Sequence, residues 1–148
     1  MRQDLLRQME DILNNGGINY TTFLRSYAVH RCPGVSLEDL AQEALGQVVV
    51  IDNIQDVSAS DIESALRECL AYAGDAGAGP EEGIIGSNEF CVLLDNICED
   101  MKIQSEQSAS LQSFRFKEGH PAYPVFWDFA FAFLCEGGGK ILVCSSSD

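Results

Sequence analysis

The sequence predicts an α+β fold in which N-terminal helices pack on a C-terminal antiparallel sheet, a meander that ends in a hairpin. Before residue 104, four segments repeat apolar side chains at the spacing of a helix. From residue 111 onward, the side chains alternate with a period of two, which is typical of strands. Three consecutive glycines, Gly137–Gly139, separate the last two alternating segments and indicate a tight turn between paired strands.

The helices are delimited by capping and breaking residues. Ser36 is followed three positions later by Asp39, and this spacing marks a helix start. Ser58 and Ser60 are likewise followed by Asp61 and Glu63, which makes two overlapping capping boxes, so either serine is a candidate start. The expected helices cover residues 3–14, 36–45, a segment from Ser58 or Ser60 to Ala73, and Asn88 to about Ile103.

Two segments are ambiguous. In residues 21–30, the spacing of Phe23, Leu24 and Tyr27 fits a short helix. The run Val48–Ile51 is rich in β-branched residues and is either a buried strand or the tail of the preceding helix, and its length does not decide between them.

The remaining chain is expected to form strands and loops. Residues 127–134 alternate aromatic with mostly small side chains, which predicts a strand with one large and one small face. The segment from Gly74 to Gly86 holds five glycines and Pro80 and predicts a loop. Further strands are expected at 111–118 and 140–144, and a further loop at 104–110.

The chain is strongly acidic, and its charge is unevenly distributed. Its 148 residues, a common size for one domain, carry 23 acidic and nine basic side chains, for a net charge of −14. Residues 47–106 hold thirteen acids and two bases, net −11, whereas residues 1–46 carry −2 and residues 107–148 carry −1. Solubility alone would account for such charge, and so would a surface matched to a basic partner.

Composition argues against several classes of partner. Nucleic acids and anionic membranes are bound by clusters of Lys and Arg, and none occurs here. The start of the chain lacks the apolar segment of a signal peptide, and no apolar run is long enough to span a bilayer. We therefore expect a soluble, cytoplasmic protein.

The six cysteines do not form a metal or redox motif. No Cys-x-x-Cys occurs, and no histidine lies near Cys91 and Cys98 to complete a zinc site. Most cysteines lie within apolar runs, so we expect them to be reduced and mostly buried.

No catalytic or cofactor motif is present. Neither glycine-rich segment has the spacing of a phosphate-binding loop. The two histidines lack a local nucleophile signature, although Cys135 and His120 could meet in space. Asp128, within the aromatic strand, is either a structural hydrogen-bonding group or an acid with a raised pKa in a pocket. We expect no enzyme activity, no cofactor and no metal.

The end of the chain, with residues 123–129, a hairpin and Ser145–Asp148, resembles bacterial immunity proteins, which are small cytosolic inhibitors encoded together with toxins. That resemblance covers about the last quarter of the chain and implies a task, not a fold or particular residues. Together with the charge, it predicts an inhibitor of a basic toxin or enzyme. The alternatives are a small-molecule-binding or enzymatic domain with a pocket near Asp128 and His120, and a structural adaptor. The expected partner-binding residues are Asp95, Glu99, Asp100, Glu81 and Glu82.

Overall fold

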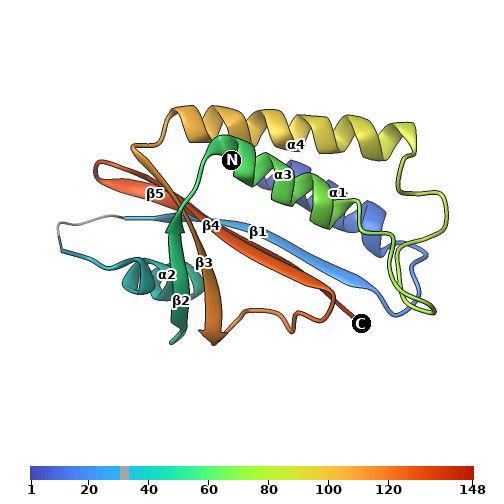
Figure 1. Cartoon of the computed structure of the whole chain (residues 1–148), viewed down its shortest axis with the longest axis horizontal. Coiled ribbons are helices and arrows are strands. Elements are labelled where there is room, and N and C mark those ends of the chain that lie inside the picture. Colours follow the sequence, from blue (N-terminus) through green and yellow to red (C-terminus); the bar gives the residue numbers. More distant parts are fainter. Residues whose placement is uncertain (31–33) are drawn as a thin grey trace.

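The computed structural model describes residues 1–30 and 34–148 and contains helices on both faces of one sheet (Figure 1). The order along the chain is α1 (Gln3–Asn14), β1 (Thr21–Val29), α2 (Leu37–Leu45), β2 (Val50–Asp56), α3 (Ala59–Leu70), α4 (Asn88–Glu106), β3 (Ser110–Glu118), β4 (Trp127–Cys135) and β5 (Gly138–Ser147). This arrangement confirms the predicted α+β class. Within the described residues, no helix combines the length and the apolar character that crossing a membrane requires.

The sheet has five antiparallel strands in the order β1-β5-β4-β3-β2. Its centre is the predicted C-terminal meander, since β3, β4 and β5 are consecutive both in the chain and in the sheet. The two edges, β1 and β2, come from the N-terminal half of the chain. Closing the sheet therefore requires pairing between strands far apart in sequence, such as Leu24 with Cys144.

The alternating side chains of β4 decide which helices cover which face. Phe131 and Phe133 point into a core formed with α1, α3 and α4. Ala130 and Ala132 point to the opposite face, where α2 packs close to the sheet. The predicted large and small faces of this strand therefore both exist, and each is covered by a different set of helices (Figure 1).

The predicted caps form as expected at two helices. The hydroxyl of Ser36 accepts a hydrogen bond from the N–H of Asp39, whose carboxylate accepts one in return from the Ser36 N–H. Ser58 and Asp61 form the same reciprocal pair, so α3 is capped at Ser58 and not at Ser60. Hydrogen bonds from these serines hold the pKa of each aspartate below its usual value.

The short helix that the spacing of residues 21–30 fits does not form, because residues 21–29 are strand β1. Phe23 and Tyr27 pack on the α2 side of the sheet, and Leu24 packs on the other side. The spacing that suggests a helical stripe is also the spacing of a strand buried on both faces. Pairing with β5 along the whole of β1 settles the conformation.

Several boundaries also differ from the prediction. Helix α3 ends at Leu70 and not at Ala73, and β5 covers Gly138–Ser147 and not only residues 140–144. The Val48–Ile51 run does enter a strand, but β2 begins at Val50 and continues to Asp56 through a bulge at which Asn53 has φ +50°. Helix α4 continues to Glu106, so residues 104–106 are helical and not part of a loop. The Ser105 hydroxyl, which donates to the Met101 carbonyl, lies within this added turn.

Side chains from α1 cover the free edge of β1. Gln3 donates to the Leu24 carbonyl and accepts from the Ser26 N–H, while Glu10 accepts from the Leu24 N–H at 2.7 Å. Asn14 completes the row at Thr22. Exposed edges invite pairing with other chains, and this row of side chains occupies the groups that such pairing would use.

Side chains from α2 likewise bond to backbone groups at the start of β2. Glu38 accepts from the Ile51 N–H at 3.0 Å, and Gln42 donates to the Val49 carbonyl at 3.2 Å. Both edges of the sheet are thus closed, at least in part, by carboxylate and amide side chains of a neighbouring helix.

Candidate functional site

Five exposed carboxylates gather around the C-terminal end of α1. We call this region the acidic end; its members are Asp11, Asp75, Glu81, Glu82 and Glu89. They come from α1, from the loop that precedes α4 and from the first turn of α4. In Figure 1 these three segments lie together at the right-hand side of the molecule. Each of the five lines one of two neighbouring hollows.

The first hollow, the loop pocket, has a volume of about 590 Å³ and lies between Gly16 and the glycine-rich loop. Ile18 and Gly79 exchange backbone hydrogen bonds of 2.9 Å, which hold the loop against the end of α1. Gly16, at φ +74°, lies so close to Glu81 that an added Cβ would be 2.8 Å from its carboxylate oxygen. The loop pocket therefore presents Asp75, Glu81 and Glu82 beside Ile18, whose side chain is 65% exposed.

The second hollow, the α1/α4 groove, has a volume of about 510 Å³. Its floor is made of apolar side chains from both helices, and polar side chains form its rim. Val92 on α4 is 52% exposed within this groove, whereas Leu5 and Leu93 below it are buried. The complete lining is Leu5, Gln8, Asp11, Ile12, Asn88, Glu89, Val92, Leu93 and Asn96.

The electrostatic character of the acidic end is uniformly negative. Neither lining contains a lysine, arginine or histidine. Among the described residues, none of the five carboxylates takes part in an ion pair. Helix α1 also has no basic residue in its last turn, so the negative end of its dipole adds to the field.

The structure separates the five residues that the sequence singles out. Glu81 and Glu82 belong to the acidic end, but Asp95 lies on the α3 side of α4. There, Arg67 donates to Asp95 at 3.0 Å and to Glu63 at 2.9 Å, and these two bonds raise the pKa of Arg67. Asp95, one of the expected partner-binding residues, is therefore not an unpaired charge.

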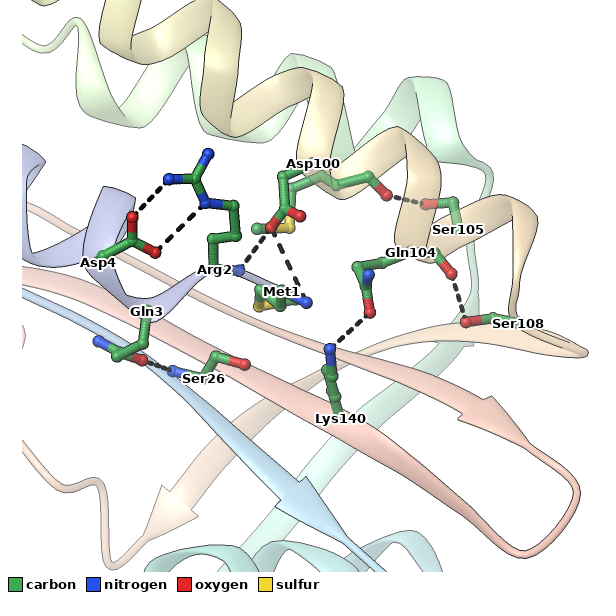
Figure 2. A network of polar contacts seen from close by, with 11 residues as sticks. Met1, Arg2, Gln3, Asp4, Ser26, Asp100, Gln104, Ser105, Ser108 and Lys140 are labelled. Carbon is green, nitrogen blue, oxygen red and sulfur yellow. Dashed lines mark hydrogen bonds and ion pairs between the residues drawn. The ribbon is translucent and has the colours of Figure 1, made fainter.

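Asp100 points back to the start of the chain, as Figure 2 shows. Its carboxylate accepts a hydrogen bond of 2.7 Å from the Arg2 N–H and lies 3.9 Å from the Met1 amino group. Burial lowers the pKa of that amino group to about 6. Asp100 thus joins α4 to α1, while Glu99, one residue earlier, remains exposed.

Asp128 and His120 lie at the same end of β4, but His120 is not part of the lining of the pocket that Asp128 borders. Asp128 borders a hollow of about 440 Å³ on the polar part of the sheet, together with Asn53 and Arg115. His120 packs edge-on against the Phe116 ring and accepts a hydrogen bond of 3.0 Å from the Ala122 N–H. Burial lowers the pKa of His120, which favours a neutral ring.

Cys135 and His120, which the sequence offers as a catalytic pair, lie far apart. Cys135 lies beside the β4–β5 turn, where its thiol donates to the Gly138 carbonyl, whereas His120 precedes the opposite end of β4. A nine-residue strand separates them by roughly 25–30 Å, so they form no dyad. Outside residues 31–33, no group of three or more His, Cys, Asp or Glu side chains is arranged to hold a metal.

The cysteines only partly match the expectation of burial. Cys98 and Cys144 are buried, Cys69 and Cys135 are half-buried, and Cys91 is exposed. All five are free thiols, while Cys32 lies outside the described residues.

Sequence reasoning missed three members of the acidic end, namely Asp11, Asp75 and Glu89. Asp11 and Glu89 are far apart in the chain, and no local pattern links them.

Comparison of this chain with models of known protein families, with curated proteins and with solved structures finds no match.

Proposed function

We propose that this protein is a non-catalytic binding protein that captures a basic protein through its acidic end. The observation that carries the proposal is the gathering of five exposed carboxylates, without a basic side chain, around two hollows. Like charges brought together on a surface repel one another and give the fold no stability. A partner with complementary charge would turn this repulsion into attraction and accelerate association.

The finer proposal is that the partner is a toxin or another harmful enzyme, which this protein inhibits. Rapid capture is the property that such an inhibitor needs, and electrostatic attraction supplies it, with association rate constants up to about 10⁸–10⁹ M⁻¹s⁻¹ at low salt. The resemblance of the C-terminal residues to immunity proteins supports the same role.

The test begins with the partner. Proteins captured by the immobilised chain at low ionic strength and released by salt would be identified and purified. Association rates would then be measured by stopped-flow fluorescence across a range of ionic strengths. We expect a basic partner and an association rate that falls steeply as salt rises.

Two charge-reversal variants locate the contact. Glu81→Lys with Glu82→Lys changes the acidic end, and we expect it to slow association by about tenfold or more at low salt. Asp95→Lys with Glu99→Lys changes the formal charge equally on the α3 side, where Arg67 already neutralises Asp95. We expect a smaller effect there. A partner without excess positive charge, or rates unaffected by both variants, would contradict the proposal.

Absence of catalysis is part of the proposal. If this protein were an enzyme, His120 and the pocket beside Asp128 would be its candidate active site. A reproducible activity in a broad hydrolase and transferase screen, abolished by Asp128→Asn or His120→Ala, would favour the enzymatic alternative instead.

A further inference from the structure

We infer that the α1/α4 groove binds a basic amphipathic helix of the partner, with an apolar side chain of that helix against Val92 and basic side chains toward Asp11 and Glu89. This inference rests on the proposed function and names the chemistry of the contact. It makes the groove, and not the loop pocket, the centre of the interface.

The groove has the dimensions of a short helical contact. It extends along α1 from Leu5 to Ile12 and along α4 from Asn88 to Asn96. Eight to nine residues of helix span about 12–13 Å, which is slightly more than two turns. A partner helix presents side chains at i, i+3 and i+4 over that length, so one apolar stripe fits between α1 and α4.

Val92 is the apolar anchor of this contact. Its side chain is 52% exposed on α4, and an exposed β-branched residue is a poorer helix former than alanine or glutamate. Folding therefore gains little from a valine at this position. An apolar partner side chain would cover Val92 and contact Ile12, while Leu5 and Leu93 already close the floor.

The charges on the rim select for a basic partner. Asp11 and Glu89 lie on the two helices that form the groove, and the other polar side chains of the lining are uncharged amides. A helix with lysine or arginine beside its apolar stripe would place a positive charge near each carboxylate. An acidic or neutral helix would leave both carboxylates without a partner.

On the other flank of α4, by contrast, two carboxylates are already paired. There, Arg67 of α3 bridges Glu63 and Asp95, so these two carboxylates already have a cationic partner. On the α1 side, neither carboxylate of the groove has one within the described residues. This asymmetry is the reason to assign the contact to the α1/α4 groove.

The probe for this inference is a synthetic peptide of leucine and lysine arranged with helical periodicity. A peptide of the same composition in scrambled order has the same charge but no apolar stripe. Binding of both would be measured by fluorescence anisotropy at several salt concentrations, and methyl NMR shifts would locate the contact. We expect at least about tenfold tighter binding of the ordered peptide, with shifts at Val92, Ile12 and Leu5.

Val92→Glu separates apolar contact from charge, because the two make opposite predictions. The substitution adds a negative charge, so attraction by charge alone would tighten binding of a basic peptide. Loss of the apolar contact would instead weaken it, and we expect a loss of at least about tenfold. Ile103→Glu is the matched control: this side chain is 42% exposed on the same helix but outside the groove. It should not weaken binding, and both variants should unfold at the wild-type temperature.

The inference is overturned if Val92→Glu binds as tightly as the wild type, if the scrambled peptide binds equally well, or if the shifts map to Ile18 in the loop pocket. Sedimentation that shows a second copy of this chain held through Val92 would also overturn it. In each of these cases, salt-dependent capture of a basic protein would leave the proposed function standing. Absence of any salt-dependent binding, to either the peptides or a basic protein, would overturn both.

Discussion

The carboxylate of Glu10 on α1 accepts a hydrogen bond of 2.7 Å from the backbone N–H of Leu24 on the edge strand β1. A helix side chain thus occupies the position that the backbone of a sixth strand would take. Glu10 is buried, and its second oxygen pairs with the Arg25 guanidinium. One carboxylate therefore satisfies a strand N–H and neutralises a neighbouring cation.

Removal of this carboxylate should destabilise the fold. Glu10→Ala leaves the Leu24 N–H without its acceptor and removes the carboxylate that pairs with Arg25, and we expect the free energy of unfolding to fall by about 2–4 kcal/mol. Glu10→Gln keeps an acceptor for the Leu24 N–H and should lower the free energy of unfolding by less. Urea denaturation followed by circular dichroism measures both, and Asp11→Ala, at the exposed neighbouring residue, should change stability by less than about 0.5 kcal/mol. Equal stability of Glu10→Ala and wild type would show that the edge contact is dispensable.

The capping box of α3 should make stability depend on acid pH. Hydrogen bonds from Ser58 lower the pKa of Asp61 in the folded state, so the ionised carboxylate favours folding. That contribution is fully present above the unfolded pKa of about 3.9 and is lost as pH falls through the lower folded value. Asp61→Asn should therefore be less stable than wild type at pH 6, and the difference should shrink below about pH 4. A difference in unfolding free energy that stays constant from pH 6 to pH 2 would contradict this account.

His120 should contribute a second pH dependence, at higher pH. Burial lowers its pKa from 6.5 in the folded state, so the unfolded chain binds a proton more readily. Stability should be highest above the unfolded pKa and should fall as pH drops below about 6.5. His120→Asn keeps a hydrogen-bond acceptor but does not titrate, and it should flatten this slope between pH 7.5 and 5.5. His30→Asn should keep this slope. Loss of the slope in His30→Asn would show that His30, and not His120, causes it.

The thiols should differ in reactivity according to burial. Cys91 is exposed on α4 and should react rapidly with iodoacetamide in the native protein. Burial raises the pKa of Cys98 to about 11 and that of Cys69 to about 11, so both should react slowly, as should the fully buried Cys144. Peptide mapping by mass spectrometry would measure each rate. Rapid modification of Cys98 before unfolding would refute the packing of α4 against α3.

The local part of this fold could be predicted from the sequence, because the signals lie within a few residues of one another. Ser36 with Asp39 and Ser58 with Asp61 each begin a helix through hydrogen bonds across three positions. The alternation in residues 127–134 predicts both faces of β4, and Gly137–Gly139 predicts its turn into β5. The net charge likewise indicates an acidic surface without any knowledge of the fold.

Tertiary structure alone decided the edges of the sheet and the composition of the acidic end. Residues 21–29 form a strand because β5 and the side chains of α1 satisfy its backbone, and β5, which pairs along its whole length, is far from it in sequence. Asp95 and Asp100 look like free charges in the sequence, but folding brings Arg67 and the start of the chain to them. Asp11 and Glu89 meet at one groove only because α1 and α4 pack together. Pairing and charge proximity depend on contacts between distant residues, whereas caps and periodicity do not.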